Sequence, residues 1–172
     1  MGGQPSRMSS LEVLRVLVAD DNLHMRAIVT AVLKSLGIRM IKQANDGAQA
    51  LAILHQWQAD LAVVDFRMEP IDGVEFTRLV RQSEHSPNIY LPIIMLTGHS
   101  EESRVASARD TGVDEFLVKP LNVTGLMARL NAVVYRRRPF IRTEGYFGPD
   151  RRRQRAPFHT GPWRRHDDSK PD

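Results

Sequence analysis

Residues 16–21 read Val-Leu-Val-Ala-Asp-Asp, four apolar residues that end in a pair of carboxylates. Short apolar runs rich in branched residues are typical of strands buried on both faces of a parallel sheet. The pattern returns in residues 61–65, 93–97 and 116–119, where the run ends in an aspartate, a threonine and a lysine. In open α/β sheets the chemistry gathers beyond the carboxyl ends of the strands. We therefore expect these polar side chains to meet at one edge of a sheet.

Apolar runs alternate with segments of helical periodicity along the first part of the chain. The expected strands are residues 14–19, 38–43, 60–65, 92–97 and 114–118, and the expected helices are residues 22–36, 46–57, 72–83, 100–111 and 122–136. Strict alternation favours right-handed crossovers with helices on both faces of the sheet. The predicted fold class is α/β, a doubly wound five-stranded parallel sheet with five helices.

Length and composition suggest one domain with an appendage. The chain has 172 residues, 42% of them hydrophobic, which is enough for one core of common size. We expect a flexible N-terminus over residues 1–12, a globular domain over residues 13–136, and a largely irregular basic tail over residues 137–172. Glycine and proline interrupt that tail too often for a long element, so we expect it to be disordered without a ligand.

Several classes of protein are excluded by composition. The absence of cysteine rules out disulfides and thiolate metal sites. No stretch approaches the roughly 18 consecutive apolar residues of a membrane span. The first ten residues lack the apolar core of a signal peptide. These features predict a soluble cytoplasmic protein.

The net charge of +4 is unevenly distributed. Residues 1–135 carry 13 basic and 15 acidic side chains, whereas residues 136–172 carry 11 basic and 5 acidic ones. Ten of those eleven basic residues are arginine. This asymmetry indicates an acidic domain whose basic arm seeks an anionic partner.

The carboxylates at the strand ends point to phosphoryl chemistry. If Asp20, Asp21 and Asp65 lie within a few ångströms, their repulsion calls for a cation, and ligation by oxygen alone suits Mg²⁺. Lys119 would help to screen a phosphoryl group, the Asp65 carboxylate could attack it in line, and the Thr97 hydroxyl could donate to it afterwards. Each residue alone is more often a cap or turn residue. Their occurrence after separate strands, in the required order, favours the functional interpretation.

On these motifs, residues 14–135 resemble the receiver domain of two-component response regulators, the CheY-like family. The resemblance rests on Val-Leu-Val-Ala-Asp-Asp (16–21), Leu-Ala-Val-Val-Asp (61–65), Met68, Asp72-Gly73, Pro-Ile-Ile-Met-Leu-Thr-Gly (92–98) and Phe-Leu-Val-Lys-Pro (116–120). It implies a flavodoxin-like strand order 2-1-3-4-5, for which CheY is a standard example. It also implies a signalling protein rather than a metabolic enzyme, with a histidine kinase or phosphotransfer protein as its partner.

The resemblance assigns a role to each site residue. Asp65 becomes the phosphoacceptor and Lys119 the phosphate-binding lysine, while Thr97 and Phe116 become switch residues. The expected Mg²⁺ ligands are Asp20, Asp21 as the direct ligand, Asp65 and the backbone carbonyl of Arg67. Two departures stand out: Glu69 and Pro70 follow Met68 where the family has proline directly, and Phe116 stands where many relatives carry tyrosine.

The tail contains an internal repeat rich in arginine. Gly-Pro-Asp-Arg-Arg at residues 148–152 returns as Gly-Pro-Trp-Arg-Arg at residues 161–165. Guanidinium groups match the guanine edge and clamp phosphates, and aromatic rings stack on bases. Cyclic di-GMP has two guanines and two phosphates related by two-fold symmetry. Its expected contacts are Asp150, Arg151, Arg152, Arg155, Trp163, Arg164, Arg165, Asp167 and Asp168.

The tail also resembles the extensions of CheY-like proteins that bind cyclic di-GMP and act in motility and attachment. That resemblance implies a signalling adaptor whose downstream target belongs to the motility machinery. Two alternatives stay open. The basic arm could bind nucleic acid or an acidic protein without specificity. The chain could instead be a phosphotransfer intermediate with an inert tail. No helix-turn-helix pattern follows residue 136, so a transcription factor is not expected.

Overall fold

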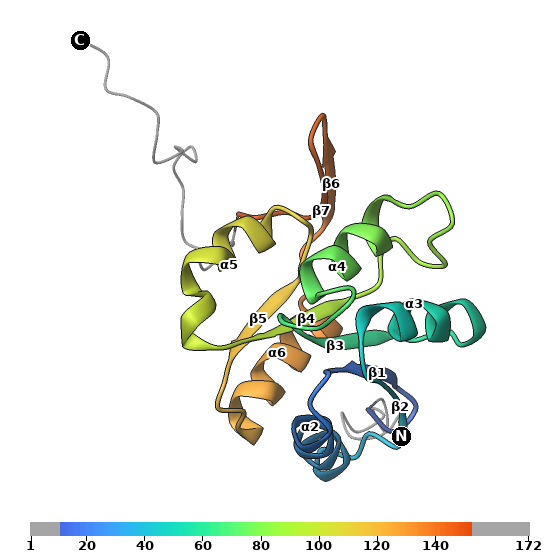
Figure 1. The fold of residues 1–172 in the computed structure, drawn as a ribbon, viewed down its shortest axis with the longest axis vertical. Coiled ribbons are helices and arrows are strands. Elements are labelled where there is room, and N and C mark those ends of the chain that lie inside the picture. The colour runs from blue at the N-terminus through green and yellow to red at the C-terminus, as the bar shows by residue number, and fades with distance from the viewer. Residues whose placement is uncertain (1–10, 153–172) are drawn as a thin grey trace, which may run out of the picture.

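A five-stranded parallel sheet in the order β2-β1-β3-β4-β5 forms the centre of the protein (Figure 1). The computed structural model describes residues 11–152. The strands are β1 (Arg15–Ala19), β2 (Met40–Ala44), β3 (Leu61–Asp65), β4 (Ile93–Thr97) and β5 (Glu115–Val118). The helices are α2 (Leu23–Ser35), α3 (Gly47–Gln56), α4 (Gly73–Gln82), α5 (Glu102–Arg109) and α6 (Val123–Tyr135), with a short 3₁₀ turn, η1 (His99–Glu101), before α5. The predicted fold class is confirmed, and each expected element lies within two residues of its predicted bounds.

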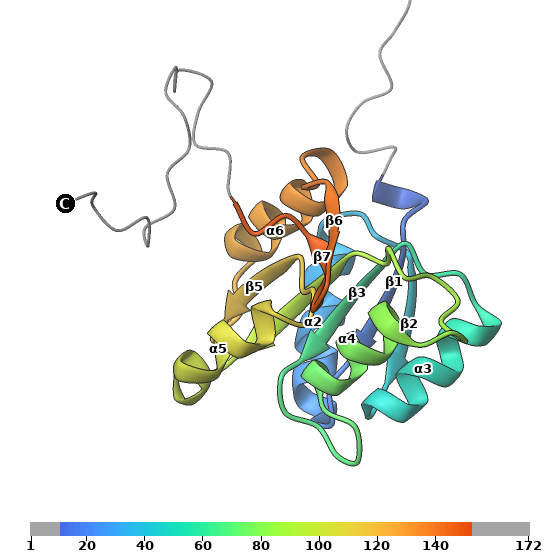
Figure 2. The same cartoon turned by 90° about the horizontal axis from the view of Figure 1, so that it is seen from above.

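Helices cover both faces of the sheet (Figure 2). On one face, Val16 and Val18 of β1 belong to a core that includes Val29 of α2 and Leu126 of α6. On the other face, the intervening strand residues pack with the helices α3 and α4. This alternation is why β1 reads as a continuous apolar run: every residue from Val16 to Ala19 is fully buried.

Side-chain caps begin four of the five helices. The side-chain oxygens of Asn22, Asp46, Asp72 and Asn122 each accept a hydrogen bond from a backbone N–H of the first turn. Such caps satisfy donors that have no partner within the helix and fix the entry of the chain. The helix α5 differs, because its first residue is preceded by Glu101, which makes no capping bond. The capped loops lie where strands end, and so hold the carboxyl edge of the sheet.

Residues 140–149 correct the expectation of an irregular tail from residue 137. They form an antiparallel hairpin of β6 (Phe140–Thr143) and β7 (Tyr146–Pro149). The rings of Phe140 and Phe147 pack against Tyr90 of the domain, with centroid distances of 5.2 and 5.5 Å. Glycine and proline interrupt long elements, but two short strands can still form where they bury aromatic side chains on an existing surface. The rest of the predicted tail, residues 153–172, lies outside the described residues.

The hairpin is attached to the domain by charge as well as by aromatic packing. Arg137 Nε lies 2.9 Å from Asp114 Oδ1, and Asp114 is itself buried. Arg138 donates a 2.8 Å hydrogen bond to the carbonyl of Asp150 at the end of the hairpin. Gly112 has a φ of +101°, and a side chain there would meet the carbonyl of Phe147 at 2.7 Å. A glycine at this position therefore allows β7 to approach the loop before β5 closely.

The N-terminal segment expected to be flexible, residues 1–12, lies only partly within the described residues. Residues 1–10 lie outside them, but Leu11 is 5% exposed and joins the core on the side of α2 and α6. The expectation of a flexible segment up to residue 12 is therefore wrong for Leu11. Within residues 11–152, no helix combines the length and the apolar character needed to cross a membrane.

Candidate functional site

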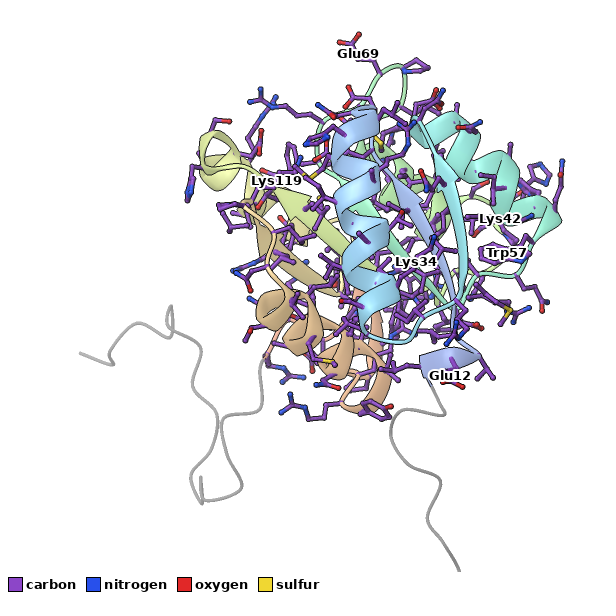
Figure 3. The ribbon with its side chains drawn as sticks, turned by 90° about the horizontal axis from the view of Figure 1, so that it is seen from below. Glu12, Lys34, Lys42, Trp57, Glu69 and Lys119 are labelled. Atoms are coloured by element: carbon purple, nitrogen blue, oxygen red, sulfur yellow. The ribbon has the colours of Figure 1, made fainter. Side chains whose placement is uncertain are left out.

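A pocket of about 330 Å³ opens at the carboxyl edge of the sheet. Lys119 lies on the side of the molecule that also carries Glu69, away from Glu12 (Figure 3). The ends of four strands supply the pocket, together with the start of α2 and the turn η1. Its lining residues are Asp20, Asp21, Asn22, Met25, Asp65, Arg67, Gly98, Glu101 and Lys119. The expected meeting of strand-end side chains is thus what the structure shows.

Three carboxylates of this pocket lie close enough to share one ion. Asp20, Asp21 and Asp65 each offer an oxygen within 4.8 Å of the others, with Asp20 and Asp65 buried and Asp21 exposed. Asp20 Oδ1 accepts a 2.9 Å hydrogen bond from the backbone N–H of Asn22, but Asp20 Oδ2 is buried with no hydrogen-bond donor. A buried carboxylate oxygen without a donor is costly. An oxygen-preferring cation would remove that cost.

The electrostatics of the cluster agree with this geometry. Burial raises the pKa of Asp20 to about 6, with a further contribution from the charge of Asp65. Burial also raises the pKa of Asp65, although its hydrogen bond to Lys119 acts in the opposite direction. Both shifts show that the site disfavours so much negative charge. A bound cation would hold these carboxylates in the ionised form.

Lys119 supplies positive charge to the same cluster. Its Nζ donates a 2.7 Å hydrogen bond to Asp65 Oδ1 and lies 3.7 Å from Asp20 Oδ2. Burial would lower the pKa of Lys119, but the hydrogen bond and charge of Asp65 outweigh burial and raise it. The amine therefore stays charged at neutral pH and holds Asp65 in place.

The remaining expected site residues lie around the pocket in different settings. Thr97 ends β4 and is 1% exposed, directly before Gly98 of the lining. Phe116 is half-buried beside a small cluster that includes Phe66 and Met95. The Arg67 side chain forms an ion pair with Glu101.

Sequence reasoning missed two polar side chains of this pocket. Asn22 both caps α2 and donates its backbone N–H to Asp20. Glu101 contributes a buried carboxylate that is 5% exposed. The position of Asn22 before a helical segment was a usable capping signal. Nothing in the residues around Glu101 distinguishes it from a solvated acid at the start of a helix.

The described part of the tail is already engaged in ion pairs. Asp150 pairs with Arg152 at 2.8 Å, and Arg151 pairs with Asp110 at 2.7 Å. A groove of about 640 Å³ lies beside these residues, between α6 and the base of the hairpin. Small apolar residues line part of it. The charged residues of its lining are five arginines and two acids: Arg129, Arg136, Arg137, Arg138, Arg152, Glu115 and Asp150. The expected contacts Arg155, Trp163, Arg164, Arg165, Asp167 and Asp168 lie outside the described residues.

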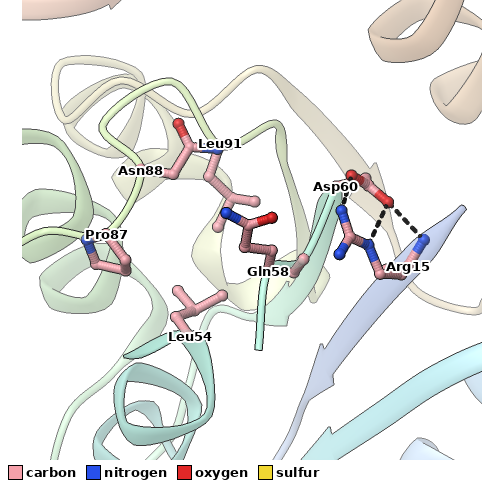
Figure 4. Close-up of a pocket in the computed structure, with 8 residues that line it drawn as sticks. Arg15, Leu54, Gln58, Asp60, Pro87, Asn88 and Leu91 are labelled. Carbon is pink, nitrogen blue, oxygen red and sulfur yellow. Dashed lines mark hydrogen bonds and ion pairs between the residues drawn. The ribbon is translucent and has the colours of Figure 1, made fainter. Parts of the chain in front are cut away.

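A further hollow of about 250 Å³ lies at the opposite, amino-terminal edge of the sheet (Figure 4). Arg15 and Asp60 in its wall bind each other through three hydrogen bonds of 2.8 to 3.1 Å. Because its charged groups satisfy each other and no carboxylate cluster lines it, this hollow offers no comparable chemistry.

The chain is similar in sequence to signalling proteins. The family described as response regulator receiver domain matches residues 16–131. The chemotaxis protein CheY of Pseudomonas aeruginosa is 30% identical over 123 residues, which cover 72% of this chain and 98% of that protein. The CAI-1 autoinducer sensor kinase/phosphatase CqsS of Vibrio cholerae is 35% identical over 120 residues, 70% of this chain but only 17% of that larger protein.

Solved structures show the same similarity in three dimensions. Chemotaxis protein CheY4 of Vibrio cholerae has a TM-score of 0.64 at 30% identity, with 70% of this chain and 98% of that chain covered. The receiver domain of the sensor histidine kinase PA1611 from Pseudomonas aeruginosa has a TM-score of 0.61 at 27% identity, with 69% and 94% covered. That structure carries a magnesium ion coordinated in the active site cleft.

Proposed function

Because the chain belongs to the response regulator receiver family of two-component signalling, we propose that it accepts a phosphoryl group on Asp65 from a histidine kinase or phosphotransfer protein. The observation that carries this proposal is the position of Asp65. Its carboxylate lies in an open pocket, 2.7 Å from the Lys119 amine and within 4.8 Å of the two other carboxylates. No other carboxylate in the described part of the chain combines these features.

The reaction follows from the groups around Asp65. An oxygen of Asp65 attacks the phosphorus of a phosphohistidine, and a new O–P bond forms as the P–N bond breaks. The histidine nitrogen leaves with the electron pair, and Asp65 becomes an acyl phosphate. Lys119 stays beside the product and offsets its added negative charge. The buried hydroxyl residue Thr97 would donate to a phosphoryl oxygen once β4 and η1 adjust.

The clustered oxygens of Asp20, Asp21 and Asp65 suit a Mg²⁺ ion, and we propose the backbone carbonyl of Arg67 as a further ligand. The set consists of oxygens only, which this ion prefers, and the buried oxygen of Asp20 that accepts no hydrogen bond is a ready ligand. When bound, Mg²⁺ neutralises charge that would otherwise repel the phosphoryl donor. Thr97 and Phe116 are the residues that we propose to change position after phosphorylation. Half-buried Phe116 can turn inward without leaving a hydroxyl unsatisfied.

Phosphorylation of the full chain by acetyl phosphate should depend on Mg²⁺. With MgCl₂ present, we expect intact-mass spectrometry to show the addition of one phosphoryl group. With EDTA in place of MgCl₂, we expect background labelling, because the carboxylate cluster then repels the donor. Equal labelling with MgCl₂ and with EDTA would show that the carboxylates hold no functional cation.

We further propose that the arginine-rich tail binds cyclic di-GMP and that the protein acts as a signalling adaptor. Within the described part, support comes from the arginine-lined groove beside Asp150 and Arg152. Five guanidinium groups against two carboxylates leave it positively charged, as a ligand with two phosphates requires. The repeat at residues 148–152 and 161–165 agrees with the two-fold symmetry of this ligand. A downstream protein of the motility machinery belongs to the same proposal.

Calorimetry can separate a specific tail site from general anion binding. The full chain should bind cyclic di-GMP with micromolar or better affinity at moderate salt, whereas GMP and duplex DNA should bind more weakly and lose affinity steeply as salt rises. A truncation after Arg152 keeps the hairpin and its contacts and should lose the specific affinity. If all three ligands bind alike, the arm is a nonspecific basic segment. If none binds, the tail is inert, and the result supports the alternative of a phosphotransfer intermediate.

A further inference from the structure

The carboxylate of Glu101 occupies hydrogen-bond donors at the mouth of the Asp65 pocket. Glu101 Oε2 accepts a hydrogen bond from the backbone N–H of Gly98. Glu101 Oε1 lies 2.6 Å from Arg67 Nε and accepts a 3.2 Å hydrogen bond from Ser100 Oγ. Arg67 donates a second bond, 3.2 Å long, to Ser100 Oγ. The result is a buried acid held by three donors, all within the turn after β4 and the loop after β3.

These donors belong to the same pocket as the proposed phosphoacceptor. Gly98, Arg67 and Glu101 line it together with Asp65 and Lys119. Backbone N–H and guanidinium groups are also the donors that a phosphoryl group takes. A phosphoryl group on Asp65 would replace a single negative charge by about two. Glu101 and the phosphoryl oxygens would then compete for one set of donors at close range.

We infer that Glu101 is an internal anion that fills the phosphoryl-binding donors of the resting protein and must leave them when Asp65 is phosphorylated. The inference rests on the proposed phosphorylation of Asp65 and adds a residue that sets its rate. In the resting protein Glu101 repels the phosphoryl donor and occupies Gly98. In the phosphorylated protein the Gly98 N–H and the Arg67 guanidinium turn to the new anion.

The surroundings of Glu101 allow such a movement to be transmitted. Glu101 ends η1 and directly precedes α5, which it does not cap. Ala108 is the one buried residue of α5 among those whose burial is described. A helix held by so little buried surface shifts at low cost. Release of Glu101 would therefore move η1 and α5, and so change the surface that α5 presents to a partner.

We call the hold of the Glu101 carboxylate on Gly98 and Arg67 the latch. Two substitutions remove it in different ways. Glu101→Gln removes the charge with little change in shape. Gly98→Ala keeps the charge but places a methyl group 2.9 Å from Glu101 Oε2, so the flexible carboxylate must move away. Each variant is expected to be phosphorylated by acetyl phosphate about three- to tenfold faster than the wild type at saturating Mg²⁺, because a unit charge a few ångströms away acts only weakly on a donor that enters a pocket open to water. Glu69→Gln, an exposed acid on the loop after β3, should match the wild type.

The Gly98 amide proton gives a direct readout that folding defects would not imitate. In ¹H–¹⁵N spectra of Glu101→Gln it should move upfield, because its acceptor loses the negative charge. In the wild type treated with beryllofluoride and Mg²⁺ it should stay downfield, because the bound anion replaces the carboxylate as its acceptor. Unchanged labelling rates in both variants, with the wild type labelled, would overturn the latch and leave the phosphoacceptor proposal intact. Acceleration in Glu101→Gln alone would show that the charge acts without holding Gly98, and would overturn it too. A wild type that takes no phosphoryl group would instead refute the proposed function.

Discussion

Replacement of Asp65 by asparagine is expected to abolish phosphorylation of the chain by acetyl phosphate in the presence of Mg²⁺. The asparagine side chain has nearly the same shape, but its amide is a far weaker nucleophile than a carboxylate. It also removes one of the three negative charges of the carboxylate cluster, whose oxygens lie within 4.8 Å of each other. Both losses act on the same step, so we expect intact-mass spectrometry to detect no labelled protein.

The control for this experiment is Glu69→Gln in the loop that follows β3. Glu69 is exposed and does not line the pocket, so its replacement should leave labelling unchanged. Lys119→Ala offers a second comparison, because it keeps the nucleophile and removes only the amine at 2.7 Å. Labelling of Asp65→Asn to the wild-type extent would mean that another carboxylate accepts the phosphoryl group. Peptide mapping would then identify that residue.

The strand-end residues were predictable because parallel strands bring distant parts of a chain to one edge. The sequence pattern placed Asp20, Asp65, Thr97 and Lys119 at the ends of four separate strands, and each of these residues is found at that edge. The strand pattern of the local sequence determines where these residues lie, so their position can be predicted without knowing any long-range contact. The roles of these residues depend on chemistry that the pattern only suggests, and they stay predictions until labelling is measured.

Glu101 and the hairpin were not predictable, for a different physical reason. Glu101 stands in a polar segment, and its burial depends on the position of Arg67, which belongs to the loop after β3. The hairpin depends on Phe140 finding a surface made by Tyr90. Both are long-range contacts between segments without a clear local signal. Breaker residues argue against a long element, but they do not exclude a short one that is stabilised by tertiary contact.

The hairpin contacts connect the tail to the interior of the domain through one buried charge. Asp114 is 4% exposed and accepts hydrogen bonds from Arg81, from the backbone of Ile93 and from Arg137 of the segment leading into the hairpin. The Arg81 side chain is fully buried, and burial lowers its pKa to about 10, an effect that the charge of Asp114 partly offsets. Arg81 thus stays charged at neutral pH. Asp114 is the one carboxylate that the described structure pairs with it.

Asp114→Asn is therefore expected to destabilise the protein by about 3–5 kcal/mol, the usual cost of removing one partner of a buried ion pair. Urea denaturation followed by circular dichroism should show a lower midpoint, and trypsin should cleave the hairpin sooner because Arg137 loses its anchor. Asp110→Asn is the matched control. It breaks the ion pair between Asp110 and Arg151, whose side chains are 61% and 50% exposed, respectively. The loss of stability should therefore be less than about 1 kcal/mol.

A double substitution tests whether the buried charge of Arg81 causes the loss of stability expected for Asp114→Asn. If the unpaired guanidinium produces the loss, then Arg81→Met in the Asp114→Asn background removes that charge. The double variant should then lose less stability than the sum of the two single variants, because the two residues interact directly at 3.0 Å. Strict additivity would locate the loss elsewhere, in the hydrogen bonds that Asp114 accepts from Ile93 and Arg137. In that case the hairpin anchor, rather than the compensation of Arg81, would be the main role of Asp114.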